Sequence, residues 1–154
     1  MEERCGMMIT IDNFERITKE FERLIKSIEF LQKETFMHST ITIEQYIVLD
    51  LIDSHSNCTT SELASIKNVK KSSITVIINR LSEKGFVEKK INKLDKRSSF
   101  LVLTINGMSV LKESRTKFVS LLSDYFDIDT DKFNECIRIL EYLNRNFNEK
   151  GLDK

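Results

Sequence analysis

The segment LDKRSSFL, residues 94–101, places one acid and two bases directly before an apolar run. Lysine can attract phosphate groups, and this role is expected for Lys96 in the segment and for Lys93 just before it. An arginine on a thin turn, here Arg97, can reach into a narrow groove of negative potential. Asp95 would restrain the Arg97 guanidinium by a paired hydrogen bond, or it would close the turn by bonding its own backbone. These residue types are suited to binding a nucleic-acid backbone.

A second polar surface follows from the spacing in KKSSITVIINRLSEKG, residues 70–85. At roughly 100° per residue, the side of a helix opposite its isoleucines presents small polar side chains and one valine. Serine and threonine can bond phosphates or bases, asparagine can pair with adenine, arginine with guanine, and an outward Val76 can touch a thymine methyl group or be an ordinary surface valine. The residues expected to make contacts are Lys71, Ser72, Ser73, Thr75, Val76, Asn79 and Arg80.

Two short helices must position these side chains. The segment 59–68 predicts a helix with Thr59 or Thr60 as its cap, Leu63 and Ile66 directed inward, and Ala64 at a close helix crossing. After a break near 68–69, a second helix is predicted at about 70–84, with Gly85 as its stop. Two short helices joined by a tight turn predict a helix-turn-helix, whose second helix enters the major groove of DNA.

The charged segment at 94–97 lies between two segments that favour strands. FVEKKINK precedes it and SSFLVLT follows it, so a β-hairpin with a basic tip is predicted at about 86–104. A hairpin after a helix-turn-helix defines a winged helix. The predicted fold class is therefore mainly α, of the α+β type.

Long helices are predicted on both sides of this winged helix. A helix is also predicted in TIEQYIVLDLID, residues 42–53, with Thr42 as its N-cap and Gln45 completing a capping box, and Asp129 or Thr130 can cap the last helix. Apolar residues recur at helical spacing at Phe14, Ile17, Phe21, Leu24, Ile28 and Leu31, and again at Phe133, Ile137, Leu140, Leu143 and Phe147. These stripes would pack in a two-fold dimer or, alternatively, in a helical bundle within one chain.

Composition and charge limit the class of protein. With 154 residues, 40% of them apolar, the chain can bury a core, and it has no apolar run long enough for a membrane span or secretory signal. Residues 60–100 carry ten Lys/Arg and four acids, whereas the remainder carries fourteen and twenty. We expect a cytoplasmic protein with no membrane partner whose basic block faces a nucleic acid, although a solvated basic surface is the alternative.

Other chemistry has weaker support. His55 and Cys58 are one pair without two further ligands, so neither a metal site nor a cofactor is predicted. Three cysteines with no CxxC spacing predict reduced thiols, so Cys5 beside Arg4 is expected to be an inert thiol, with a redox sensor as the alternative. No phosphate loop, nucleophile elbow or catalytic carboxylate pair is found, so the chain is not predicted to be an enzyme.

The ordered motifs of the middle segment resemble those of the MarR family of bacterial transcription regulators. They are Leu63-Ala64, the Leu-x-x-x-Gly-x-Val element at 81–87, Asp95-Lys96-Arg97 in the wing, and the Leu-Thr-x-x-Gly exit at 103–107. Lys70 departs from the family pattern, since a capping serine or aspartate is common there. The resemblance covers about 50 residues closely, and the flanking helices agree in layout.

The resemblance implies a homodimeric regulator, expected to be a repressor, that binds a pseudo-palindromic operator in double-stranded DNA. A small aromatic or amphipathic effector, or oxidation, would release it. Residues 1–38 would form the N-terminal dimerisation helix, 42–104 the DNA-binding domain and 105–154 the C-terminal dimerisation helices. The alternative function is a winged-helix module whose basic face binds an acidic protein.

Overall fold

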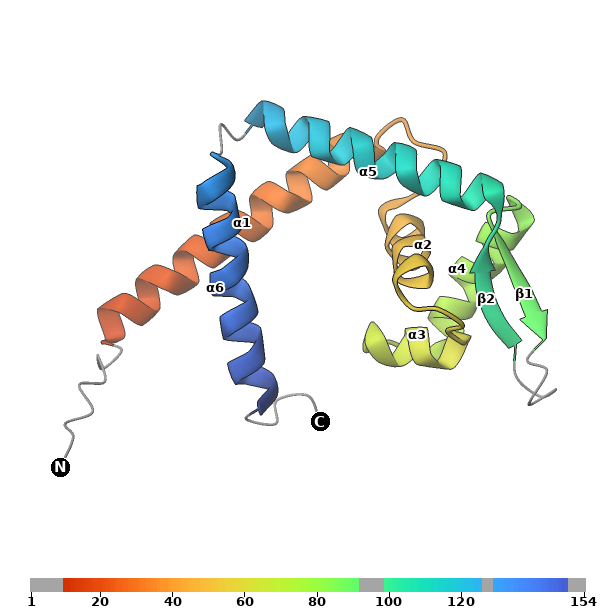
Figure 1. The fold of residues 1–154 in the computed structure, drawn as a ribbon, viewed down its shortest axis with the longest axis horizontal. Coiled ribbons are helices and arrows are strands. Elements are labelled where there is room, and N and C mark those ends of the chain that lie inside the picture. Colours follow the sequence, from red (N-terminus) through yellow and green to blue (C-terminus); the bar gives the residue numbers. More distant parts are fainter. Residues whose placement is uncertain (1–9, 92–98, 126–128, 150–154) are drawn as a thin grey trace. The chain divides into compact units, whose positions relative to one another are not determined.

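A computed structural model describes residues 10–91, 99–125 and 129–149 (Figure 1). The elements in these ranges are α1 (Ile11–Phe36), α2 (Ile43–Ser54), α3 (Thr60–Ile66), α4 (Lys71–Glu83), β1 (Val87–Ile91), β2 (Ser99–Leu103), α5 (Ile105–Tyr125) and α6 (Thr130–Glu149). The chain forms two compact units, one up to Phe118 and the other from Val119. None of the described helices combines the length and the apolar character needed to cross a bilayer.

The core of the first unit lies under α2, α3, α4 and the hairpin. Its fully buried members include Val48 and Leu49 of α2, Leu63 of α3, and Ile78 and Leu81 of α4. α2 contacts α3, α4 and β2, so one helix supports both the helix pair and the sheet. The winged helix thus buries its apolar side chains within one chain.

Local capping explains where α2 and α3 begin. The Gln45 backbone N–H donates to Thr42 Oγ1 at 3.3 Å, and the Thr42 N–H donates to Gln45 Oε1 at 3.2 Å, which confirms the predicted capping box. Thr59 and Glu62 form a second box at the start of α3, with distances of 2.7 and 3.2 Å. Each box satisfies two N–H groups that the first turn of a helix leaves unpaired.

The end of α3 differs from the sequence prediction in the placement of one side chain, that of Ile66. Asn68 adopts a φ of 51°, which turns the chain sharply between the two helices. Leu63 is fully buried and Ala64 nearly so, but Ile66 is 48% exposed rather than directed inward. Because successive residues turn by about 100°, a helix side centred between Leu63 and Ala64 leaves Ile66 on its outward flank.

The hairpin has a regular antiparallel register. Val87 pairs with Leu103, and Lys89 pairs with Leu101. The Leu101 N–H also donates to the Cys58 carbonyl oxygen at 2.9 Å, so the loop before α3 is tied to β2. Val87 and Leu101 are buried, and these two side chains anchor the hairpin on the core.

One junction joins α4, β1 and α5. α4 stops before Gly85, whose φ of 70° favours glycine. Thr104 Oγ1 donates to the Gly85 carbonyl oxygen at 2.6 Å and accepts from the Gly107 N–H at 3.0 Å. A Cβ added at Gly107 would lie 2.0 Å from the Phe86 carbonyl oxygen, so this backbone approach requires glycine.

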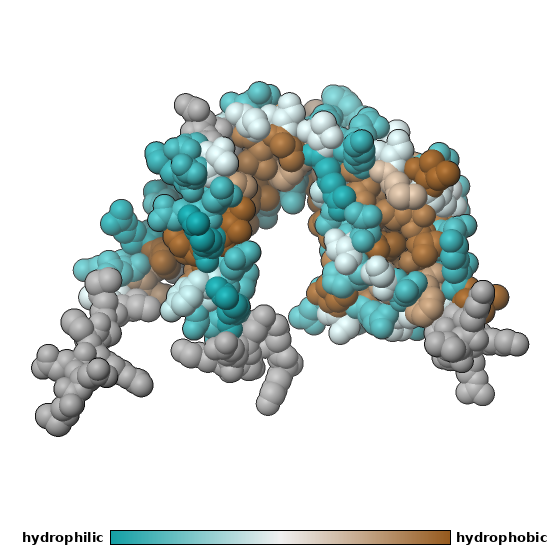
Figure 2. All heavy atoms as spheres, in the orientation of Figure 1, coloured by the Kyte–Doolittle hydropathy of each residue, from teal (hydrophilic) through white to brown (hydrophobic). Residues whose placement is uncertain are grey.

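The apolar stripe of α1 reaches solvent. Thr10 caps the helix by accepting from the Asn13 N–H at 3.2 Å. Phe14, Ile17 and Leu24 are exposed, whereas Leu31 and Phe36 near the helix end are buried, and Figure 2 shows hydrophobic side chains at the surface along α1. Most of the stripe is therefore uncovered in a single chain.

The second unit contains the end of α5 and the helix α6. Asp129 caps α6, since the Asp131 N–H donates to Asp129 Oδ1 at 3.0 Å, so the first of the two predicted capping residues is the one used. Phe133, Ile137 and Leu140 recur at helical spacing on α6, and all three are exposed. This unit, like α1, presents an uncovered apolar stripe.

Candidate nucleic-acid interface

α4 presents the polar side that its spacing predicts. Ile74, Ile78 and Leu81 are fully buried, which fixes the rotation of the helix on the core. The residues on the other side are exposed: Lys71, Ser72, Ser73, Val76, Asn79, Arg80 and Glu83, with Thr75 partly exposed at the margin. The seven candidate contact residues of α4 thus lie on one accessible surface.

Their hydrogen-bonding groups differ in availability. Thr75 Oγ1 donates to the Lys71 carbonyl oxygen at 2.9 Å, so the hydroxyl proton is used inside the helix. Within the described ranges, no hydrogen bond or ion pair engages the side chains of Asn79 and Arg80. An amide and a guanidinium without intramolecular partners can pair with base edges.

The start of α4 is basic and has no side-chain cap. Lys70 is the N-cap residue, and its side chain makes no capping hydrogen bond, as expected for a lysine at this position. The unpaired N–H groups of the first turn and the positive end of the helix dipole both favour an anion there. Lys70 and Lys71, both exposed, add positive charge at the same end.

The hairpin provides the second basic element. Lys89 and Lys90 on β1 are exposed, and Lys90 pairs with Glu88 at 3.2 Å. Ile91, the last residue of β1, pairs with Ser99, the first residue of β2. The predicted wing residues lie outside the described residues: Lys93, Asp95, Lys96 and Arg97.

Lys84 is a residue that the sequence did not single out. Its Nζ donates to the Thr40 carbonyl oxygen at 2.6 Å and to Gln45 Oε1 at 3.2 Å. Gln45 is buried and already belongs to the α2 capping box, so Lys84 ties the end of α4 to the connection between α1 and α2. A lysine next to Gly85 signals a helix end, but the partners 39 and 44 residues away carry no sequence signal.

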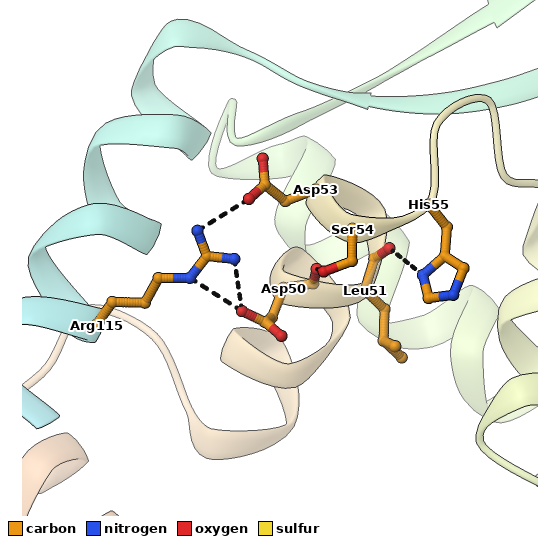
Figure 3. A network of polar contacts seen from close by, with 6 residues as sticks. All are labelled: Asp50, Leu51, Asp53, Ser54, His55 and Arg115. Atoms are coloured by element: carbon orange, nitrogen blue, oxygen red, sulfur yellow. Dashed lines mark hydrogen bonds and ion pairs between the residues drawn. The ribbon is translucent and has the colours of Figure 1, made fainter. Parts of the chain in front are cut away.

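A second unexpected contact joins α5 to α2 (Figure 3). Arg115 donates to Asp50 Oδ1 through Nε at 3.0 Å and through Nη2 at 2.7 Å, and its Nη1 lies 2.9 Å from Asp53 Oδ2. The hydrogen bonds to Asp50 raise the pKa of Arg115 above its ordinary value, and those to Asp53 act in the same direction. A planar guanidinium that bridges two carboxylates one helical turn apart fixes the rotation of α5 against α2.

The sulfur and imidazole groups do not form a site within the described ranges. Cys58 is buried, and burial raises the pKa of its thiol, which makes it a poor nucleophile at neutral pH. His55 Nδ1 lies 3.0 Å from the Leu51 carbonyl oxygen (Figure 3), and the described residues hold no group of three metal-ligating side chains. Cys136 is exposed on α6, and the candidate sensor Cys5 lies outside the described residues.

Comparisons with known proteins agree with this arrangement. The model of the MarR family matches residues 41–99. The uncharacterized HTH-type transcriptional regulator YdgG of Bacillus subtilis is 30% identical over 139 residues, which cover 86% of this chain and 89% of YdgG. The HTH-type transcriptional repressor MdtR of the same organism is 25% identical over 116 residues, 75% of each chain.

A solved structure shares the fold. The crystal structure of Streptococcus pneumoniae FabT in complex with DNA superposes with a TM-score of 0.72. Sequence identity is 18%, and the superposition covers 88% of this chain and 98% of FabT.

Proposed function

The chain belongs to the MarR family and is a DNA-binding transcriptional regulator rather than an enzyme, and we propose that it represses transcription as a homodimer on a pseudo-palindromic operator. The exposed side of α4 carries this proposal. It presents Asn79 and Arg80 without intramolecular partners among the described residues, on a helix whose first turn is basic. Such a helix suits the major groove, where amide and guanidinium groups distinguish bases.

The wing would supply the second contact. Arg97 would enter the minor groove, Lys93 and Lys96 would attract phosphates, and Asp95 would restrain Arg97. Val87 and Leu101 support this role, because their burial holds the base of the hairpin on the core. A short hairpin fixed at its base delivers its tip to one place on the duplex.

The homodimer is supported by the uncovered stripes. Phe14, Ile17 and Leu24 on α1, with Phe133 and Ile137 on α6, are large apolar side chains exposed to water in the single chain. Covering such surfaces with the same surfaces of a second copy removes apolar area from water and generates two-fold symmetry. Two recognition helices related by a two-fold axis read a palindrome.

Repression and its release complete the proposal. The relative MdtR is a transcriptional repressor by name, and we extend that role to this chain. Release by a small ligand, or by oxidation at Cys5, follows from the family resemblance, and the many Phe, Met and Ile side chains favour an aromatic or amphipathic effector. A ligand that binds only the DNA-free conformation lowers DNA affinity by linkage.

Selection of bound duplexes from random DNA, followed by binding titrations over a range of salt concentrations, tests the proposal. We expect an enriched palindrome and an affinity that falls steeply with salt, since each neutralised phosphate releases counterions. Arg97→Ala should weaken specific binding and leave the fold and dimer intact, whereas Arg16→Ala on α1 is the matched control. Binding to an acidic protein, with no enriched duplex, would instead support the protein-interaction alternative.

A further inference from the structure

We propose that α4 recognises a thymine by its 5-methyl group through Val76, next to an adenine that pairs with Asn79. The inference deepens the proposed function and rests on α4 being the helix that enters the major groove. It assigns specificity to an apolar contact rather than to the charged residues of the basic block. The argument depends on the placement of Val76, Asn79 and Glu83 along one side of the helix.

Val76 occupies the middle of the reading surface. Its side chain is 50% exposed on α4, while Ile74 and Ile78 on the other side are fully buried. A valine in this position cannot form a hydrogen bond with a base, a phosphate or a sugar. When this side chain packs closely in a groove of DNA, the contact is therefore favourable only against another apolar group.

The major groove offers one such group. Among the four bases only thymine presents a methyl group in the major groove, beside its O4, whereas guanine, adenine and cytosine present mainly hydrogen-bond donors and acceptors there. Packing valine on a polar edge would remove water from that edge without replacing its hydrogen bonds, which costs free energy. Val76 thus favours thymine and disfavours the three other bases at the same position.

Asn79 lies three residues beyond Val76 on the same exposed side. Residues at this spacing on a helix have Cβ atoms about 5–6 Å apart, which corresponds to between one and two base-pair steps of about 3.4 Å. The Asn79 amide makes no hydrogen bond within the described chain, so both its N–H and C=O groups are available to adenine N7 and N6. The two side chains would read a thymine and an adenine within one short block of each half-site.

Three neighbouring residues are less suited to base contacts than Val76 and Asn79. The Thr75 hydroxyl proton is used by the Lys71 carbonyl oxygen. Glu83, one turn after Asn79, carries a charge that phosphates repel, and the Lys84 Nζ is engaged by the Thr40 carbonyl oxygen and Gln45 Oε1. The part of α4 from its start to Asn79 is consequently the part that suits the groove, since the residues that follow are less suited to base contacts.

Replacement of single thymines by deoxyuridine in the selected duplex tests the inference, because it removes one methyl group and keeps every hydrogen-bonding group. We expect one position in each half-site at which the affinity of the unaltered protein falls by about fourfold, the effect of one buried methyl group. Val76→Ala should bind the thymine duplex more weakly and show no further loss with deoxyuridine. When a cytosine–guanine pair replaces the thymine–adenine pair at this position, the affinity of the protein for the duplex should fall. The fall should be smaller when the cytosine carries a 5-methyl group.

The variant provides its own control for folding. Val76 is exposed and alanine is the better helix former, so Val76→Ala should keep the unfolding temperature of the unaltered protein. Equal affinity for all deoxyuridine duplexes, or an equal deoxyuridine loss in Val76→Ala, would overturn the inference while selective DNA binding persists. If no duplex is enriched at all, the proposed operator binding fails, and the inference fails with it.

Discussion

The winged helix and the long helices use their apolar residues in opposite ways. In α2, α3, α4 and the hairpin, the large apolar residues converge on one core, and Leu63, Ile78 and Leu81 are fully buried. On α1 and α6, apolar residues form stripes of similar regularity, yet Ile17 and Ile137 remain exposed. The same helical periodicity therefore corresponds to a buried core in one region and to an exposed apolar surface in the other.

This difference separates folding from assembly. A region that buries its own core can hold its reading helix in place in each chain, whereas an exposed stripe gains its stability only when another surface covers it. Substitutions in the two regions should accordingly be detected by different measurements. Unfolding experiments report on the winged helix, and association experiments report on the stripes.

The largest expected effect is a cavity in the winged-helix core. Ile78→Ala should lower the free energy of unfolding by about 2–5 kcal/mol, since it removes a fully buried side chain and leaves a void. Chemical denaturation at a fixed protein concentration measures this loss. Val76→Ala on the same helix is the matched control and should change the free energy by less than about 0.5 kcal/mol; equal losses would show that α4 does not have one buried side.

The next effect concerns the α1 stripe. Ile17→Glu should shift the protein from dimer to monomer, because a two-fold interface would bury the new carboxylate twice. Sedimentation at several concentrations measures the dissociation constant, which we expect to rise at least about tenfold, or about 1.4 kcal/mol. Lys26→Glu, on the opposite side of α1, is the control for added negative charge. An unchanged dimer in the Ile17 variant would remove α1 from the interface.

A smaller loss of stability is expected at the junction after the hairpin. Gly107→Ala would place a Cβ 2.0 Å from the Phe86 carbonyl oxygen, so the backbone must move. We expect a loss of about 1–3 kcal/mol in the free energy of unfolding, as for other overpacked sites. Thermal unfolding of Gly107→Ala beside Asn106→Ala, an exposed neighbour, would reveal it, and similar values for the two would contradict the close approach.

The smallest expected effect is a dependence on pH, and the two capping boxes provide a matched pair. Hydrogen bonds from the Thr59 backbone lower the pKa of Glu62. A lowered folded-state pKa means that the stabilisation is present above the unfolded-state pKa and is lost as the pH falls through the folded-state value. Glu62→Gln, which copies the Gln45 box of α2, should reduce the acid sensitivity of unfolding. Identical acid transitions in the two proteins would exclude a role for Glu62.

Local rules explain which features could be predicted from the sequence. The caps at Thr42 and Thr59, the stop at Gly85 and the exposed side of α4 depend on residues within one or two helical turns, and each is confirmed. Ile66 was predicted inward and is exposed, because a seven-residue helix has too few turns to define its buried side from spacing alone.

Contacts between distant segments could not be predicted. Arg115 reaches Asp50 across 65 residues, and Lys84 reaches Gln45 across 39, so no spacing relates the partners. Each pair depends on how helices cross, which is set by the packed core rather than by the charged residues themselves. The roles of Asp95, Lys96 and Arg97 in the wing remain predictions, as do the domain boundaries at 38, 42 and 104.

The junction at Thr104 has a consequence for protein engineering. One threonine hydroxyl bonds Gly85 and Gly107, and the Thr104 N–H donates to the Phe86 carbonyl oxygen at 3.0 Å. Hairpins exchanged between related regulators should therefore be cut inside the strands, between Val87 and Leu103. The recipient protein then keeps its own hydrogen bonds at this junction. A transplant that starts outside it would import a foreign angle between the wing and α5, even if every DNA-contacting residue were preserved.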